Sequence, residues 1–152
     1  MVRALLAQSQ IFKNLTDREA EKVGEICEIL ELKAGDFVFR EGDEGDRLYI
    51  VDKGEVRISR TIPGAGEEAL TVLKRGACFG EMSVLDHSSR STDAIVHMRC
   101  ELISITREDF RGLLDSDREL GYKVLWNVVH LVCERLRMTN DAMRSLMVMA
   151  MF

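Results

Sequence analysis

The sequence predicts an α+β domain built around an antiparallel β-roll, a jelly-roll-like double-stranded β-helix, with an N-terminal helix and C-terminal helices that include one long helix. Residues 32–106 contain short apolar runs separated by glycines at regular intervals, which is typical of antiparallel strands. The flanking segments have apolar residues at helical spacing instead. We therefore expect a single domain over residues 1–152, with the β-roll at about 32–106 and the C-terminal helices at about 107–150.

Residues 1 to about 31 are predicted to be helical. Thr16 and Glu19 have the spacing of a capping box, in which the hydroxyl and the carboxylate each accept a backbone hydrogen bond at the start of a helix. Ile11 and Phe12 precede this cap and are suited to stapling the start of the helix. The apolar residues that follow at roughly helical spacing are Val23, Ile26, Cys27, Ile29 and Leu30.

The middle of the chain is predicted to contain short strands. Gly54 follows Asp52 and Lys53, a combination that predicts a tight hairpin turn between the strands on either side. The only proline, Pro63, lies in a longer loop over residues 62–67. The expected strands are Phe37–Phe39, Leu48–Val51, Val56–Ser59, Leu70–Leu73, Ile95–Val96 and Leu102–Ile105.

Two helices are expected after the strands. A short helix over residues 108–114 ends near Asp115–Asp117, and a long helix runs from about Arg118 to the end. The long helix has a heptad stripe in which Thr139 is the polar member. The stripe has two interpretations: it packs on the same helix of a second copy, or it covers the core of its own domain. Its apolar members are Leu125, Val129, Val132, Leu136, Met143, Leu146 and Ala150.

Composition excludes several classes of protein. The net charge of −5 and pI near 5.3 argue against a surface that tracks nucleic acid by charge alone. No apolar run is long enough to cross a bilayer, and the apolar start is too short for a secretory signal. Four widely spaced cysteines predict reduced thiols and a cytoplasmic location. The three histidines are dispersed, so we expect no metal site.

The segment from Gly80 to Ser91 combines residue types that suit a phosphorylated sugar. Gly80 lets the backbone approach a ligand closely, and Glu81 begins a short segment whose backbone N–H groups suit an anion. A carboxylate accepts hydrogen bonds from sugar hydroxyls. Nine residues later, Arg90 offers a planar fork of donors that matches a phosphate, and Ser91 adds a hydroxyl.

This segment resembles the phosphate-binding cassette of the cyclic nucleotide-binding domain family. The cassette pattern is matched in order and spacing by residues 79–85 and by Arg90–Ser91. Residues 39–43, 48–51 and 53–56 are similar to early strands of the family's β-roll. The lead-in at residues 11–16 and the helical segment 134–140 extend the resemblance to roughly residues 10–141.

The resemblance implies a role for each matching residue. Glu81 would accept from the ribose 2′-OH, Arg90 would pair with the exocyclic phosphate oxygens, and Gly80 would allow close approach. Ser91 and the backbone N–H groups of Met82 and Ser83 would complete the phosphate cradle. From the long helix, Thr139 would reach the purine, and Asn140 would do so across a dimer. Asp93 departs from the family pattern, and strand alternation predicts that its carboxylate points away from the phosphate.

The expected ligand is cAMP, with cGMP as the alternative. In related kinases a hydroxyl after the cassette arginine, here Ser91, accompanies cGMP. In bacterial activators an Arg-Ser pair with a threonine on the long helix, here Thr139, accompanies cAMP. The bacterial pattern matches at two positions, Ser91 and Thr139, whereas the kinase pattern rests on Ser91 alone. The two matches favour cAMP over cGMP.

The leading functional hypothesis is a non-enzymatic sensor module that forms a homodimer and signals through its C-terminal helices. A cupin-like enzyme would need clustered ligands, whereas His87 and His97 stand apart. An alternative is the N-terminal sensor fragment of a catabolite-activator-type transcription factor. The residues up to Phe152 leave no room for a helix-turn-helix after the long helix, so we expect this chain not to bind nucleic acid directly. Another is a degenerate, ligand-free dimerisation module, against which the intact Glu81 and Arg90 weigh.

Overall fold

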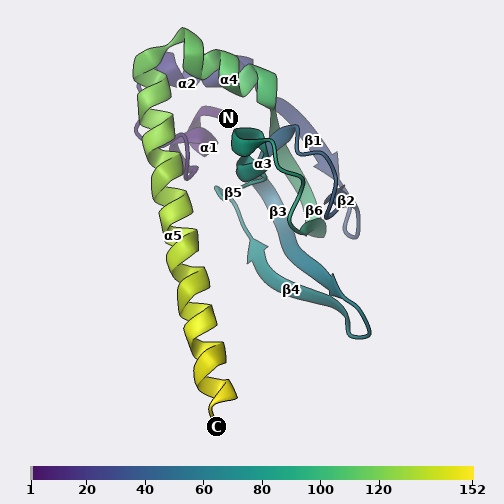
Figure 1. The fold of residues 1–152 in the computed structure, drawn as a ribbon. Helices are drawn as coiled ribbons and strands as arrows, with labels where there is room; N and C mark the ends of the chain where they lie inside the picture. The colour runs from purple at the N-terminus through teal and green to yellow at the C-terminus, as the bar shows by residue number, and fades with distance from the viewer. Residues whose placement is uncertain (1) are drawn as a thin grey trace.

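The structure, a computed structural model, describes residues 2–152 and confirms the α+β class. Two short helices, α1 (Val2–Gln8) and α2 (Asp17–Glu25), precede the strands (Figure 1). The short helix α3 (Glu81–Asp86) lies between the last two strands, and α4 (Arg107–Ser116) and α5 (Arg118–Ala150) follow the last strand. The strands are β1 (Glu28–Leu32), β2 (Phe37–Phe39), β3 (Arg47–Ile62), β4 (Gly66–Leu73), β5 (Cys78–Phe79) and β6 (Asp93–Thr106).

Two long strands, β3 and β6, form the centre of the antiparallel sheet, whose order is β1-β6-β3-β4. Each long strand changes its other neighbour along its length. At one end β6 pairs with β1 and β3 pairs with β5; at the other end β6 pairs with β2 and β3 pairs with β4. Because the partner changes along each strand, the β3–β6 pair runs through both ends of the roll, the end with β1 and β5 and the end with β2 and β4.

Two hydrophobic clusters hold the fold together. One lies between the helices and the nearer ends of β3 and β6, and it includes Phe12, Ile50 and Phe110. The other lies inside the roll and includes Tyr49, Phe79 and Leu102. Burial of such side chains removes apolar surface from water and is the main stabilising contribution to a domain of this size.

The helix starts follow local signals in the sequence. Both hydrogen bonds of the predicted capping box are present between Thr16 and Glu19. Asp117 caps α5 by accepting a hydrogen bond from the backbone N–H of Leu120, and Thr106 caps α4 in the same way. The predicted starts and ends of α4 and α5 agree with the structure within a few residues.

Three sequence predictions were wrong in this region. Ile29 and Leu30 lie in β1 rather than in a helix, because α2 ends at Glu25 and residues 28–32 pair with β6. Gly54 does not form a hairpin turn: β3 continues through it, with register shifts in its pairing with β6 over residues 51–56. The two predicted strands at 95–96 and 102–105 are likewise one strand, β6.

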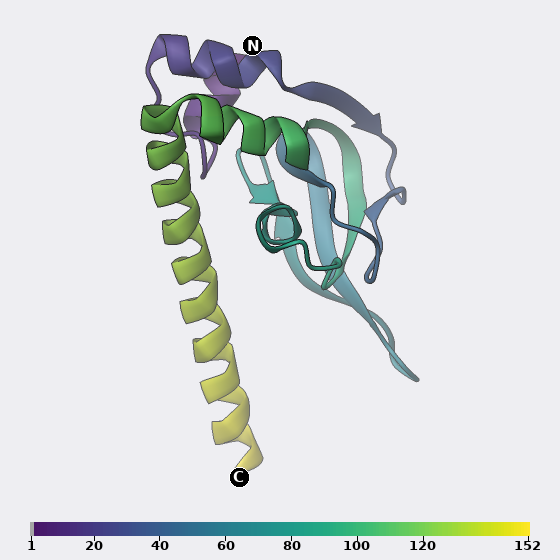
Figure 2. The same cartoon turned by 45° about the horizontal axis from the view of Figure 1, so that its top comes forward.

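Helix α5 is anchored at its N-terminal half and uncovered at its C-terminal half. Asn127 donates hydrogen bonds to the carbonyls of Ile11 and Lys13, and Lys123 pairs with Glu19 on α2. Leu131 is the last buried residue of α5. Figures 1 and 2 show the rest of the helix extending away from the helical end of the domain. The heptad stripe therefore does not cover the core: its members Leu125, Val129, Val132, Leu136, Met143 and Leu146 are 37–65% exposed.

None of the helices described over residues 2–152 combines the length and the apolarity that a membrane span requires.

Candidate ligand-binding site

A cavity of about 540 Å³ lies between α3, the outer part of the roll and α5. It brings together seven of the eight residues that the sequence predicts for the site, from segments far apart in the chain; Asn140 is exposed and does not line the cavity. The seven residues are Gly80, Glu81, Met82, Ser83, Arg90, Ser91 and Thr139.

Arg90 is held rigidly in the wall of this cavity and is only 3% exposed. Its two terminal nitrogens donate to the backbone carbonyls of Gly80 and Arg47, at 2.8 and 2.6 Å. The guanidinium carbon lies 4.2 Å from the centre of the Phe39 ring, which is cation–π geometry. Burial lowers the pKa of Arg90 from its usual value. Its Nε has no hydrogen-bond partner among residues 2–152.

Gly80 is required by this arrangement. Its φ of +78° lies in the left-handed region, and a Cβ there would stand 2.7 Å from a terminal nitrogen of Arg90. Only glycine adopts this conformation routinely and leaves the arginine its place against the backbone.

Glu81 is the first residue of α3 and is 1% exposed. Its Oε1 accepts a hydrogen bond from Arg135 on α5, whereas its Oε2 is buried with no partner among the described residues. Burial raises the pKa of the Glu81 carboxyl, and Arg135 opposes part of this shift. Glu81 and Arg90 form no ion pair with each other, which excludes the simpler interpretation of a surface salt bridge between them.

Arg135 is a charged site residue that the sequence did not predict. Its Nη1 donates to Glu81 and its Nη2 donates to the carbonyl of Cys78 at 2.6 Å, so α5 is tied directly to the cassette. Arg135 lies four residues before Thr139 and therefore on the same face of the helix. That spacing, together with the expected role of Thr139, was the available signal.

The cassette helix packs tightly against the loop before β3. Ser83 is buried, and a Cβ on Gly45 would stand 2.0 Å from the Ser83 Cβ. Arg107 donates to the carbonyls of both Gly45 and Ser83, which fixes this contact. Met82, in contrast, is half exposed. The shape of the cassette thus depends on a glycine that the sequence analysis did not select.

The remaining predicted residues lie at the edge of the cavity. Thr139 is exposed, and its hydroxyl donates to the carbonyl of Arg135 at 2.9 Å. Ser91 is exposed, and its carbonyl accepts from Arg60. Asp93 accepts from the backbone N–H of Glu41 at 2.7 Å, so its carboxylate is engaged away from the cavity, as strand alternation predicts.

The other walls of the cavity are largely apolar. They include Ile58, Leu70 and Leu73 from β3 and β4, Phe79, and Met138 from α5. Such walls suit a flat ring, while the charged residues that line the cavity are Glu81 and Arg90 of the cassette and Glu134 and Arg135 of α5.

Metal-ligand clusters are absent among residues 2–152: no three His, Cys, Asp or Glu side chains converge. The four cysteines are free thiols; Cys78 and Cys100 are buried, whereas Cys133 is exposed.

The roll, the short helix after Gly80, and the buried Glu81 and Arg90 define a β-roll domain with a cavity whose volume is that of a small-molecule site. The family model described as the cyclic nucleotide-binding domain matches residues 29–117, more than half of the chain, and the chain belongs to this family.

Three relatives illustrate the similarity. The chain is 29% identical over 142 residues to a CRP-like cAMP-activated global transcriptional regulator of Mycobacterium tuberculosis, covering 93% of this chain and 62% of that protein. It is 36% identical over 129 residues to a cyclic AMP receptor protein of Thermus thermophilus, covering 85% and 58%. The crystal structure of the N-terminal domain of a Streptomyces coelicolor transcriptional regulator has a TM-score of 0.77 and 32% identity, covering 91% of this chain and 94% of that one. The chain thus spans about three-fifths of the length of the two curated relatives.

Proposed function

We propose that this domain is a non-catalytic sensor that binds a cyclic nucleotide, cAMP in preference to cGMP. One observation carries the proposal: Glu81 and Arg90 are buried with opposite charges in the wall of one cavity and do not pair with each other. Glu81 is paired with Arg135 and Arg90 with two backbone carbonyls, but Oε2 of Glu81 and Nε of Arg90 are buried with no partner among the described residues. Leaving buried polar atoms of ionised groups unsatisfied is costly, so such atoms are retained where a ligand compensates them. A ribose hydroxyl suits the free Oε2 of Glu81, and a cyclic phosphate suits the guanidinium of Arg90.

The size and lining of the cavity support the same ligand. A volume of about 540 Å³ falls within the range of small-molecule sites, about 300–1,000 Å³. With the phosphate at Arg90 and the ribose at Glu81, the base extends toward the apolar walls and Thr139. The threonine hydroxyl then exchanges its hydrogen bond with the Arg135 carbonyl for one with the base.

Signalling through α5 follows from the contact between Arg135 and Glu81. A ribose hydroxyl at Oε2 and Arg135 at Oε1 share one carboxylate, so a ligand that repositions Glu81 changes the restraint on α5 at this point. The N-terminal half of α5 remains anchored through Asn127, whereas the helix beyond Leu131 is free to respond. We further propose that the domain acts in the cytoplasm, where its free thiols stay reduced.

Calorimetric titration with cAMP and cGMP tests the ligand directly. We expect saturable binding of both nucleotides, with cAMP the tighter. Absence of binding by either would contradict the proposal and favour the ligand-free dimerisation module.

Replacing Glu81 with alanine is expected to weaken cAMP binding by about 1.5–3 kcal/mol, the contribution of a hydrogen bond to a charged group. Calorimetry measures this loss. Because burial raises the pKa of Glu81, its ionisation makes the ligand-free domain less stable as pH rises through that pKa. Glu81→Gln should therefore have a thermal stability at pH 7 at least equal to that of the parent, and it should also bind cAMP more weakly. Parent affinity in both Glu81→Ala and Glu81→Gln would show that Glu81 is not part of the site.

Replacing Thr139 with alanine is expected to reduce the preference for cAMP over cGMP. The parent margin should be about 1–2 kcal/mol, because one or two hydrogen bonds determine it. Titration of both nucleotides into the parent and the variant measures the margin. Tighter binding of cGMP by the parent would overturn the ligand assignment, and an unchanged preference in the variant would show that Thr139 does not explain it.

We also propose a symmetric homodimer through α5, supported by the exposed heptad stripe. An aspartate at Val132, in the middle of the stripe, would bury a charge in both copies and should weaken the dimer at least about tenfold. Light scattering over a concentration series measures the change. His130→Asp, which places the same charge on an exposed position outside the stripe, is the control. A parent chain that stays monomeric at high concentration would contradict the dimer, and with it the role of Asn140 across it.

A second candidate is the sensor part of a longer transcription regulator. It is favoured by the similarity to the N-terminal domain of the Streptomyces regulator, almost all of which the chain covers. A helix-turn-helix encoded in frame beyond Phe152 would support this role, and a stop codon there would exclude it.

A further inference from the structure

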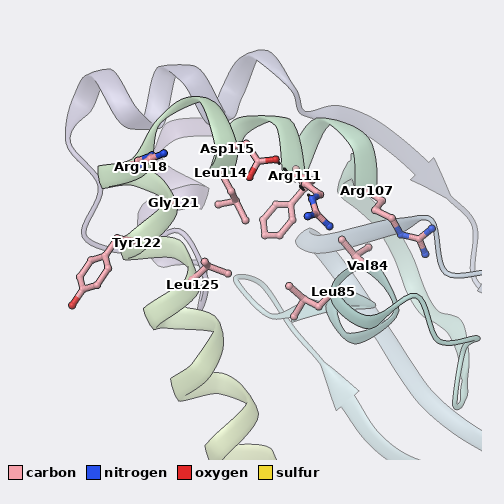
Figure 3. A pocket seen from close by; sticks show the side chains of 11 residues that line it. Val84, Leu85, Arg107, Arg111, Leu114, Asp115, Arg118, Gly121, Tyr122 and Leu125 are labelled. Carbon is pink, nitrogen blue, oxygen red and sulfur yellow. Dashed lines mark ion pairs between the residues drawn. The ribbon is translucent and has the colours of Figure 1, made fainter.

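A second cavity, of about 450 Å³, lies on the other side of α3, in the corner that α3 forms with α4 and the start of α5. Figure 3 shows Val84 and Leu85 of α3 opposite Leu114 of α4 and Leu125 of α5. Leu85 is 37% exposed and Leu125, the first member of the heptad stripe, is 45% exposed, so in the single chain the surface is an open apolar groove. None of the residues predicted for the cyclic nucleotide site lines it.

The rim of the groove is cationic although the chain as a whole carries a net charge of −5. Three arginines and one acid, Asp115, line it. Arg107 is already bonded to the carbonyls of Gly45 and Ser83. Arg111 has only a solvent-exposed pair with Asp115 at 3.8 Å, which contributes little. Arg118 has no ion pair among residues 2–152. Arg111 and Arg118 are therefore available to an anion.

We propose that this groove binds an amphipathic organic monoanion, with an apolar body and one carboxylate. The volume lies within the range of small-molecule sites, and the arginines of the rim are the cationic groups that can orient a ligand on the apolar floor. An alkyl chain fills the floor between α3 and α4, and the carboxylate displaces Asp115 from Arg111. The arginines would repel a cation, and a neutral ligand would leave them without a partner.

The position of α3 couples this groove to the first cavity. Val84 and Leu85 line the groove, while Glu81 and Ser83 of the same six-residue helix line the cyclic nucleotide cavity. A ligand that fixes α3 from one side changes its fit to a ligand on the other side, and the effect is reciprocal. This coupling rests on the proposed function; binding of the anion itself does not.

Titration of decanoate into the nucleotide-free full chain, below its micellar concentration, tests the site. Calorimetry measures affinity, and methyl-labelled NMR locates the ligand. We expect saturable binding with shifts at Val84, Leu85, Leu114 and Leu125. Each methylene removed in the series to octanoate should weaken binding by about two- to fourfold, the effect of losing a buried CH₂. Arg111→Glu should weaken binding at least tenfold. Arg99→Glu, the same change at an exposed position elsewhere, should not.

Three results would overturn the site: equal affinity for decanoate and 1-decanol, equal loss in the two arginine variants, or methyl shifts at the uncovered end of α5, at Leu146 and Val148, in place of the groove. The last would show adsorption to exposed apolar surface only. The coupling is tested separately, by titrating cAMP with and without saturating decanoate. A change in cAMP affinity of at least threefold supports it, and an unchanged affinity refutes the coupling while the direct titration decides the site.

Discussion

Replacing Arg90 with alanine is expected to weaken cAMP binding by about 3–5 kcal/mol, or about a hundred- to several-thousand-fold. A phosphate binds in this cavity only if a positive charge compensates its negative charge, and Arg90 is the cationic side chain fixed within the cassette. Arg135, the other cation of the site, already donates hydrogen bonds to Glu81 and to the Cys78 carbonyl. Calorimetric titration of parent and variant gives the difference directly.

Arg90 also has structural contacts, so two controls separate binding from folding. The variant loses hydrogen bonds to the Gly80 and Arg47 carbonyls, and its thermal stability must be measured without ligand. Arg90→Lys keeps the charge but not the planar fork, and should recover only part of the affinity. Arg99→Ala removes an exposed arginine that does not line the cavity and should bind as the parent does. If folded Arg90→Ala keeps the parent affinity, the phosphate position is wrong.

Replacing Gly54 with alanine is expected to lower the free energy of unfolding by about 2–4 kcal/mol. Gly54 has a φ of +81°, which alanine adopts only with strain. Its Cβ would also stand 2.0 Å from the Arg99 carbonyl oxygen and 2.7 Å from the carbonyl carbon. Both atoms belong to the backbone of β6, which cannot move aside without disturbing the pairing of the two central strands.

Gly35 provides the matched control for this prediction. Its φ of +90° carries the same conformational strain, but nothing lies within 4 Å of a Cβ built there. Gly35→Ala should therefore cost only about 1 kcal/mol. Urea unfolding of the three proteins separates strain from collision, and equal losses in the two variants would show that the approach of Gly54 to β6 is not the cause.

The sequence determined the features whose signals lie close together in the chain. The capping box at Thr16 needs two residues three apart, and both of its hydrogen bonds are present. The start of α5 follows from Asp117 as a cap. The cassette lies within a dozen residues, so Glu81 and Arg90 could be selected together before any contact was known. In each case the physical cause, a local hydrogen bond or a short loop that closes on itself, acts over a few residues.

Tertiary structure decided what depends on distant partners. Residues 28–32 resemble the end of a helix in isolation, but pairing with β6, about seventy residues later, makes them a strand. Gly54 resembles a turn glycine, yet it marks a close approach of β3 to β6. Arg135 became a site residue because the anchoring of α5 on the N-terminal segment, at Lys13 and Glu19, brings it to Glu81. The groove beside α3 arises from three helices meeting at a corner. Propensity and spacing describe a residue's neighbours along the chain, whereas these features depend on which surfaces meet once the chain has folded.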